Sequence, residues 1–270
     1  MLLMQNVSSR AGGRIKLLYF IIIYSSILLS IMIPKNIFQT HKSHEYLKAN
    51  KELFQAAFSW YKNKGYTYKF YTDKDCDVFM QQNYPDIYPL YAKLTLPVMK
   101  ADLWRYCVIY KYGGIYADVD TILVSSPDIF IKNKDLIVAP ENADHICQWT
   151  FAAPPGSPIL KSIIDYVVSQ ISGNVYNGKH FVLNTTGPGA FTRGIQQYMA
   201  QHPQLVRHSN VYSPLGKSLT NNIYMFDYIE FHNNIVKHLF YGCKKDGWMK
   251  QRNSTIKNQK KDTFQLNVFS

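Results

Sequence analysis

The stretch from Pro97 to Asp120 constrains the fold most, because a helical pattern runs through two glycines directly into a strand pattern. Proline suits a first helical turn, where its missing N–H would have no partner, and Gly113 suits the position just past a helix end, where a left-handed backbone is needed. Asp102 and Arg105 are three residues apart, so they share one helical face. The sequence therefore predicts a helix that ends at Gly113 and presents an acid and an arginine on one side.

The segment after the two glycines has the period of two that is typical of a β-strand. One face holds Ile115, Ala117 and Val119, and the other holds Tyr116, Asp118 and Asp120. Two neighbouring carboxylates repel each other, which raises a pKa unless a cation compensates. Mn2+ and Mg2+ accept carboxylate oxygens and take further ligands from substrate phosphates. An isolated Asp-x-Asp is usually a solvated turn, but the capped helix with Asp102 and Arg105 before it makes a site the better interpretation. We therefore predict that Asp118 and Asp120 hold Mn2+ or Mg2+ and a nucleotide diphosphate.

Strand-like and helix-like segments alternate along the chain, which indicates an α/β fold. The strand-like runs are residues 33–39, 66–71, 115–120 and 135–139, and the helix-like runs include residues 44–62 and 158–171. The 270 residues are 47% hydrophobic and contain no internal repeat, which is enough for one sizeable domain. We predict that this domain covers residues 33–250.

The N-terminal region contains an apolar run, residues 15–32, in which Lys16 is the one charged residue. A helix of about 18 residues can just span a bilayer core. Arg10 and Arg14 precede the run without an acid, which favours a cytosolic N-terminus, although lysines also follow the run. We predict a short tail at residues 1–14 and a type II signal anchor at residues 15–32. A cleaved signal peptide is the alternative, but no small-x-small cleavage site follows.

The net charge is +12, and residues 251–270 are predicted to form a basic C-terminal tail. Such charge attracts anionic lipid head groups or phosphorylated donors, although a lysine-rich end is also commonly a solvated one. Nucleic acid is excluded as a partner because no recognised binding motif accompanies the charge. The four cysteines form no zinc pattern and leave disulfide pairing open, with Cys107 predicted to be a buried thiol in the helix.

Several sequence blocks resemble glycosyltransferase family 32, whose sugar-binding region contains a DxD motif. The blocks are IPKNIFQTHKS (33–43), YTYKFYTDKD (66–75), KADLWRYCVIYKYGGIYADVD (100–120), QWTFAAPPGSPIL (148–160), TTGPGAFT (185–192) and His238 followed by Gly247-Trp248. They occur in the order that the family has. One departure is Asp-Gly-Trp near the C-terminus, where relatives often have Gly-Ser-Trp.

The resemblance implies a GT-A fold, in which a mixed, mostly parallel sheet is flanked by helices and one half is a Rossmann-like nucleotide-binding unit. The implied catalytic residues are Asp102, Arg105, Asp118 and Asp120, and the implied metal ligands are Asp118, Asp120 and His238. The implied donor-binding residues are Phe38, Gln39, Thr40, Asp102, Arg105, Gly113, Gly114, Tyr116, Trp149, Thr186, Gly187 and Gly189. Plain structural roles stay open for His238, for Trp149 as a buried aromatic residue, and for the Gly-Pro-Gly segment as a tight turn.

The implied activity is a retaining transfer of mannose from GDP-mannose to a hydroxyl of a glycan or glycolipid, with the enzyme anchored in the membrane and its domain in the Golgi or ER lumen. Two nearer alternatives are galactosyl or glucosyl transfer from a UDP-sugar and mannosyl transfer to inositol phosphoceramide. A more distant alternative is an inactive, membrane-bound carbohydrate-binding protein.

Overall fold

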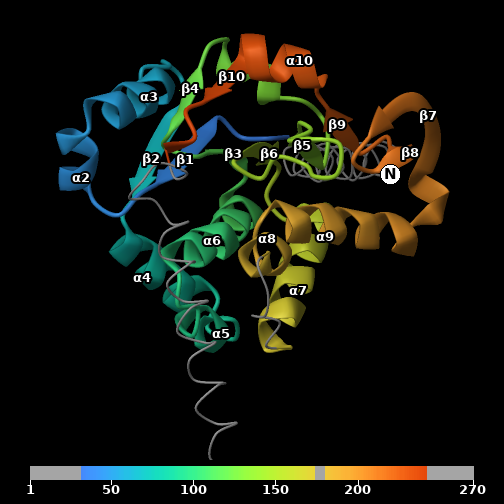
Figure 1. Ribbon diagram of the computed structural model, residues 1–270, viewed down its shortest axis with the longest axis horizontal. Helices are drawn as coiled ribbons and strands as arrows, with labels where there is room; N and C mark the ends of the chain where they lie inside the picture. Colours follow the sequence, from blue (N-terminus) through green and yellow to red (C-terminus); the bar gives the residue numbers. More distant parts are fainter. Residues whose placement is uncertain (1–31, 174–179, 242–270) are drawn as a thin grey trace, which may run out of the picture.

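The computed structural model describes residues 32–173 and 180–241. A six-stranded sheet runs through the middle of the molecule (Figure 1). The strands lie in the order β2 (Thr67–Tyr71), β1 (Asn36–Thr40), β3 (Gly114–Ala117), β6 (Thr150–Ala153), β5 (Leu136–Val138) and β9 (Ile223–Met225). Strand β1 pairs in parallel with β2 and β3, and β5 pairs in parallel with β9. Strand β6 runs antiparallel to β3 and β5. The predicted mixed, mostly parallel sheet is therefore confirmed.

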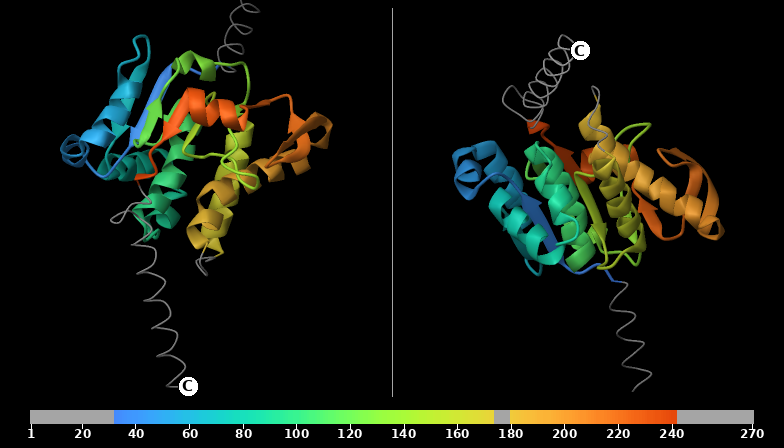
Figure 2. Two further views of the ribbon diagram at one scale, coloured as in Figure 1. Left: turned by 45° about the horizontal axis from the view of Figure 1, so that its top comes forward. Right: turned by 90° about the horizontal axis from the view of Figure 1, so that it is seen from below.

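Helices cover both faces of this sheet (Figures 1 and 2). The helices are α2 (His44–Ala49), α3 (Lys51–Tyr61), α4 (Asp73–Asn83), α5 (Tyr88–Ala92), α6 (Pro97–Tyr112), α7 (Pro158–Ser172), α8 (Phe181–Thr185), α9 (Pro188–Gln201) and α10 (Tyr228–Glu230). Helices α4 to α9 lie below the sheet in Figure 1, whereas α3 and α10 lie above it. Short 3-10 and π turns are η1 (Pro127–Phe130), η2 (Pro203–Leu205) and η3 (Phe231–Ile235).

Two small antiparallel ribbons complete the described part of the fold. One pairs β4 (Thr121–Leu123) with β10 (Val236–His238), and the other pairs β7 (Val206–Ser213) with β8 (Gly216–Thr220). The β4–β10 ribbon lies above the main sheet, beside α3 (Figure 1). It joins the end of the described chain to the segment that follows β3.

The alternation predicted around β3 is confirmed for its first residues, but both faces of the strand are buried. Ile115 and Ala117 enter a core shared with Trp60 and Phe231, on the α3 side of the sheet. Tyr116 enters the other core, which lies between the sheet and α6 and includes Trp104. A central strand covered on both faces is typical of an α/β fold. No face of β3 is therefore left open for a ligand.

Helix α6 begins at Pro97 and ends before Gly113, as the sequence predicts. Gly113 has a φ of +64°, and a Cβ there would lie 2.5 Å from Cδ of Pro155. Gly114 has a φ of +126°, and its Cβ would lie 2.6 Å from the carbonyl oxygen of Asn36. These glycines allow the chain to turn from α6 into β3 in a space too small for a side chain.

Gly113 and Gly114 are therefore not placed for the predicted donor contacts. They lie at the amino end of β3, whereas Asp118 follows its carboxyl end. Four residues of strand at about 3.3 Å each separate the two ends by roughly 13 Å. The packing between Asn36 and Pro155 explains both glycines, because it excludes a Cβ at either position.

Several element boundaries differ from the predicted ones, including β1, which begins at Asn36 and not at Ile33, and two further differences lie in α2–α3 and at the end of β3. The helix predicted over residues 44–62 is broken at Asn50, whose backbone is extended and whose side-chain amide donates to the carbonyl of Tyr46. Asparagine side chains compete in this way with helical hydrogen bonds. The strand predicted to run through Asp120 ends at Ala117, and the two aspartates lie beyond it.

The predicted anchor, apart from Met32, and the basic tail lie outside the described residues. Within the described ranges, none of the helices combines the length and the apolar composition that a bilayer crossing requires. Cys76, Cys107 and Cys147 are free and buried there, as predicted for Cys107, and Cys243 lies outside the described ranges.

Candidate active site

The two aspartates of the DxD segment sit on a fixed turn at the carboxyl end of β3. The backbone N–H of Asp118 donates to the carbonyl of Trp149 at 2.7 Å. The Asp118 carbonyl accepts from the backbone and hydroxyl of Thr121 at 3.1 and 2.6 Å, and from the amide of Gln39 at 3.1 Å. Both carboxylates therefore start from a backbone that three separate elements hold in place.

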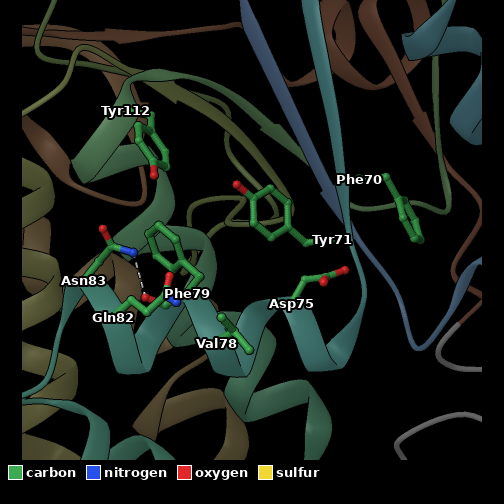
Figure 3. A pocket seen from close by; sticks show the side chains of 8 residues that line it. All are labelled: Phe70, Tyr71, Asp75, Val78, Phe79, Gln82, Asn83 and Tyr112. Carbon is green, nitrogen blue, oxygen red and sulfur yellow. Dashed lines mark hydrogen bonds between the residues drawn. The ribbon is translucent and has the colours of Figure 1, made fainter.

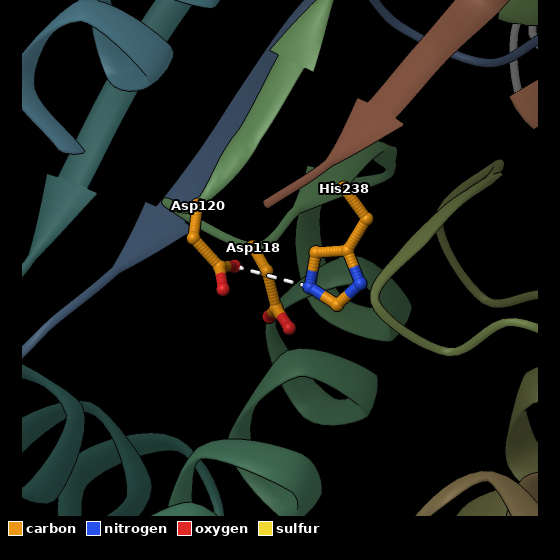
Figure 4. Close-up of side chains that lie close together, drawn as sticks. All are labelled: Asp118, Asp120 and His238. Carbon is orange, nitrogen blue, oxygen red and sulfur yellow. Dashed lines mark ion pairs between the residues drawn. The ribbon is translucent and has the colours of Figure 1, made fainter. Parts of the chain in front are cut away.

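Strand β10 brings His238 to the same turn, because it pairs with β4 and sets His238 opposite Thr121. Nε2 of His238 lies 3.3 Å from a carboxylate oxygen of Asp120. Figure 4 shows the side chains of Asp118, Asp120 and His238 gathered beneath the strand ends. One potential ligand atom from each lies within 4.8 Å of the other two, so the three residues could hold a metal ion.

The charges of Asp120 and His238 support each other. Burial by itself raises the pKa of Asp120, but the hydrogen bond and charge of His238 and the N–H of Tyr241 outweigh it, so the pKa is lowered. Burial alone lowers the pKa of His238, yet Asp120 more than compensates and the pKa is raised. The pair is thus poised as a carboxylate and an imidazolium when no cation competes for them.

Arg105 connects the acid of its own helix to the DxD turn. Its Nη2 lies 3.2 Å from Asp102, which confirms the shared helical face, and 3.2 Å from Asp118. Its Nη1 donates to the side-chain oxygen of Gln148 at 2.5 Å, and its guanidinium stacks 4.7 Å above the ring of Tyr116. Burial alone would lower the pKa of Arg105. The neighbouring Asp118, Tyr116 and Asp102 outweigh burial and raise this pKa, so the guanidinium stays charged.

Asp102 is almost completely enclosed, with 1% of its surface exposed. Its two oxygens accept from the amide of Gln148 at 2.9 Å and from the hydroxyl of Thr186 at 2.8 Å, in addition to the ion pair with Arg105. Burial raises the pKa of Asp102, and Arg105 with these donors opposes the rise. Burying a carboxylate is costly without such partners. The network fixes the helix to the start of β6.

The Thr-Gly-Pro-Gly segment contributes to the site through the side chain of Thr186 rather than through its backbone N–H groups. Thr186 donates to Asp102, and its carbonyl accepts from the hydroxyl of Tyr106. The N–H of Gly187, expected to face the donor, instead donates to the carbonyl of Val182. A Cβ on Gly189 would lie 2.9 Å from the carbonyl oxygen of Leu183, so close packing of α8 on α9 explains that glycine.

The two large aromatic residues proposed for donor binding are both buried. Tyr116 is 0% exposed, and its hydroxyl donates to the carboxylate of Asp118. Trp149 is 5% exposed, and its ring stacks 4.7 Å from His238 and lies 5.5 Å from Phe231. Trp149 thus follows the buried-aromatic alternative, and both residues position the charged groups beside them.

The three residues predicted at the end of β1 point into the protein. Phe38 packs in the core against Tyr112. Gln39 bonds to the DxD turn, and the hydroxyl of Thr40 donates to the carbonyl of Tyr71. The predicted base contact therefore does not arise from their side chains as they lie here. His41, the next residue, lies near the charges of Asp73 and Asp120, but burial outweighs them and the pKa of His41 is lowered.

Several buried polar atoms around this site lack a hydrogen-bond partner in the described part of the chain. They are Nδ1 of His41, Nε of Arg105, Oε2 of Glu141 and Nδ1 of His238. Buried polar groups in proteins nearly always have a partner, so a group of unsatisfied atoms at one site indicates a polar ligand. The mixed carboxylate and imidazole set also fits a divalent cation.

An aromatic pocket lies elsewhere, between the end of β2 and α4 (Figure 3). Its lining includes Tyr71, Phe79 and Tyr112, and it contains none of the predicted site residues. Its chemistry differs from that of the DxD turn, because four of its eight lining residues are aromatic and Asp75 is the one acid among them. The arrangement of charged groups, and not this hollow, identifies the candidate active site.

The fold and the site define an α/β protein with a metal-competent carboxylate centre at the carboxyl ends of its strands. The family model described as "Glycosyltransferase sugar-binding region containing DXD motif" matches residues 30–137. This match covers α6, β3 and the DxD turn, and it confirms the resemblance that the sequence blocks indicate.

Curated relatives extend the similarity beyond that region. The chain is 26% identical over 225 residues to an initiation-specific alpha-1,6-mannosyltransferase of Candida albicans, covering 67% of this chain and 58% of the relative. It is 34% identical over 93 residues to a mannosyl phosphorylinositol ceramide synthase of Saccharomyces cerevisiae, covering 33% and 23% respectively. The chain thus spans less than two thirds of the relatives it matches. A solved structure, PaToxG glycosyltransferase, is similar with a TM-score of 0.47 and 20% identity, covering 67% of this chain and 76% of that one.

Three residues that the sequence did not single out take part in the site. Gln148 bridges Asp102 and Arg105. The hydroxyl of Tyr106 lies within hydrogen-bond distance of two acceptors, the side-chain oxygen of Gln148 at 2.9 Å and the carbonyl of Thr186 at 2.7 Å, and can donate to one of them at a time. Tyr106 follows Arg105 and Gln148 precedes Trp149. Their position next to predicted site residues in the sequence was the one indication that they belong to the site. Glu141 had no such signal, because a single acid in a polar loop has no distinctive pattern.

Proposed function

We propose that this chain is a metal-dependent hexosyltransferase of GT-A type that transfers mannose from GDP-mannose, with retention, to a hydroxyl of a glycan or glycolipid. The observation that carries the proposal is the gathering of Asp118, Asp120 and His238 beside the Asp102–Arg105 pair. The DXD family match and the relatives' names support the same reaction class.

In this proposal Asp118, Asp120 and His238 hold a divalent ion, and Mn2+ fits best because imidazole is a poor ligand for the harder Mg2+. The ion supplies positive charge that stabilises the departing diphosphate. Arg105 adds a fixed charge next to Asp118, and its unpartnered Nε is free to donate within the described residues. Asp102, whose oxygens already accept from Gln148 and Thr186 and pair with Arg105, holds Arg105 in position, and Arg105 is the member of the pair that binds a hydroxyl of the donor sugar. Such preorganised charge is usually the largest contribution to catalysis.

The donor and the acceptor are proposed from the relatives. The name of the Candida relative supports alpha-1,6-mannosyl transfer, for which we propose a glycan acceptor, and the name of the Saccharomyces relative supports a glycolipid acceptor as the second candidate. We also propose that a type II anchor at residues 15–32 holds the domain, residues 33–250, on the lumenal side of a Golgi membrane. A lipid-linked or membrane-proximal acceptor would suit that placement.

The test is nucleotide release from a panel of donors, GDP-mannose, UDP-galactose and UDP-glucose, each with Mn2+ and with a chelator. We expect release from GDP-mannose in the presence of Mn2+ and its loss on chelation. Equal release with and without the metal would refute the metal-dependent proposal. Binding without any turnover across the panel and across mannoside and inositol phosphoceramide acceptors would favour the inactive carbohydrate-binding alternative.

The raised pKa of His238 predicts that Mn2+ affinity depends on pH. Below that pKa the imidazolium is bound to Asp120, and Mn2+ must displace a proton to use the ring nitrogen. Affinity should therefore rise with pH, approaching a tenfold gain per pH unit in the range where one proton is displaced. Calorimetric titration with Mn2+ between about pH 6 and pH 8 measures it. His238→Gln should flatten the dependence, and an equally steep dependence in that variant would exclude His238 as the source.

A further inference from the structure

Glu141 is a half-buried acid near the candidate site, with its Oε2 atom buried, and it has no role in the chemistry described above. It follows the carboxyl end of β5, in the loop that leads to β6. Strand β5 runs in the same direction as β3, so its carboxyl end lies at the edge of the sheet where Asp118 lies. The charges of His238, Asp118, Asp102 and Arg105 all act on Glu141. Glu141 therefore lies at the same edge of the sheet as the candidate site, within reach of its charges.

The backbone of this loop is held on both sides. A bridge joins Pro140 to Ile146, and the N–H of Glu141 donates to the carbonyl of His145 at 2.8 Å. The ring of His232 donates to the carbonyl of Pro140 at 3.0 Å, which ties the loop to η3. A site residue needs such support, because binding geometry is lost when its backbone moves. The loop therefore presents Glu141 as a fixed group.

The carboxylate of Glu141 forms no ion pair among the described residues, because the cations of the site pair with other acids. Arg105 pairs with Asp102 and Asp118, and His238 pairs with Asp120. Oε2 of Glu141 is buried and has no hydrogen-bond partner among the described residues. A buried acid without a partner destabilises the protein unless a ligand supplies one.

The geometry favours a hydroxyl over a metal ion as that partner. The residues whose ligand atoms come within 4.8 Å of one another are Asp118, Asp120 and His238, and Glu141 is not among them. A diphosphate would be repelled by a further carboxylate. A hydroxyl can donate to a carboxylate or accept from the protonated acid, so it matches either form of the side chain.

We propose that Glu141 binds a sugar hydroxyl at this site and so helps to select the sugar. The inference rests on the proposed transfer from a nucleotide sugar and adds a residue to it. Because donor sugar and acceptor both carry hydroxyls, the experiment has one arm for each. Rejecting an analogue that lacks a hydroxyl is a strong form of selection, because it leaves a buried polar group unpaired.

The test compares Glu141→Ala and Glu141→Gln with Asp144→Asn, which neutralises an exposed acid of the same loop. Calorimetry measures the affinities of GDP and GDP-mannose with Mn2+, and kinetics measure the KM of a mannoside acceptor. If the donor panel selects a UDP-sugar, UDP and that sugar are used instead. We expect Glu141→Ala to weaken GDP-mannose or the acceptor by about tenfold and leave GDP within about twofold. Asp144→Asn should change none of these values.

Thermal unfolding separates binding from a structural role. Removing an unpartnered buried charge should leave Tm unchanged or raise it, whereas a carboxylate that holds the loop together would lower it when replaced. A loss confined to GDP-mannose places the hydroxyl on the donor sugar, and a loss confined to the acceptor KM places it on the acceptor.

Equal loss of GDP and GDP-mannose affinity, a lowered Tm, or no change in any value would overturn the inference about Glu141. A wild-type protein that releases nucleotide from no donor would instead refute the proposed function. The two failures are thus distinguishable, because the first requires an active wild-type protein whose Glu141 variants do not show the selective loss.

Discussion

Replacement of Asp120 by asparagine is expected to lower the Mn2+-dependent release of nucleotide by at least about a hundredfold, since even loss of a residue outside the ligand set costs roughly 10- to 100-fold at metal sites. Asp120 is buried, pairs with His238 at 3.3 Å and accepts from the backbone N–H of Tyr241 at 2.9 Å. Asparagine keeps the size of the side chain but removes its charge. The change therefore tests the electrostatic role of Asp120 with little change in volume.

Release of nucleotide from the donor that the panel selects measures this effect, and calorimetric Mn2+ titration of the variant shows whether the metal is lost. Asp165→Asn is the matched control, because Asp165 is an exposed acid on α7 that pairs with Lys161. Exposed ion pairs contribute little to stability, so the control variant should stay folded and retain activity within about twofold. Wild-type release by the Asp120 variant would exclude this carboxylate from the mechanism.

Replacement of Arg105 by alanine is expected to reduce the free energy of unfolding by about 3–5 kcal/mol, the usual cost of removing one partner of a buried ion pair. Arg105 is 3% exposed and lies between the carboxylates of Asp102 and Asp118. Without its charge the enclosed Asp102 loses its counter-ion, and Asp102 and the partly exposed Asp118 repel each other. Donor turnover should be lost in the same variant, because the proposed mechanism depends on the same charge.

The instability should depend on pH in a definite direction. Burial already raises the pKa of Asp102 and of Asp118, and Arg105 opposes that rise. Without Arg105 both pKa values rise further, above those of the unfolded chain. Acids with a raised folded-state pKa destabilise the fold when ionised, so the variant should lose more stability at pH 8 than at pH 5.

Urea unfolding at both pH values measures the difference, and Arg193→Ala provides the control. Arg193 is exposed on α9, so its replacement should change the free energy of unfolding by no more than about 0.5 kcal/mol. A loss in the Arg105 variant as small as that of the control would show that the buried network is not a major source of stability.

Local rules predicted the elements whose ends are marked by their own residues. Helix α6 follows from Pro97 at its start and Gly113 at its end, and α7 begins at Pro158 as predicted. The end of β3 could not be predicted, because the period of two continues through Asp120 while the ladder with β6 stops at Ala117. The N–H of Asp118 still reaches Trp149, so a distant residue shapes the turn.

The donor-binding predictions show the same limit. Gly113 and Gly114 lie in the right motif but at the wrong end of β3, where close packing and not a ligand requires glycine. Trp149 and Tyr116 have side chains suited to a sugar, yet the fold buries them beneath charged groups. Sequence motifs identify residues that belong together, but they do not distinguish a residue that touches a ligand from one that supports it.

The sequence by itself determined the α/β class of the fold, the shared face of Asp102 and Arg105, and the acid pair at Asp118 and Asp120. These depend on residues close in the chain, whose spacing fixes their geometry. The tertiary structure alone brought Gln148 between Asp102 and Arg105 and Glu141 to the edge of the same site, and it placed His238, which the family resemblance had implied as a ligand, beside Asp120. Those contacts join residues that are far apart in sequence, because separate strands end at one edge of the sheet.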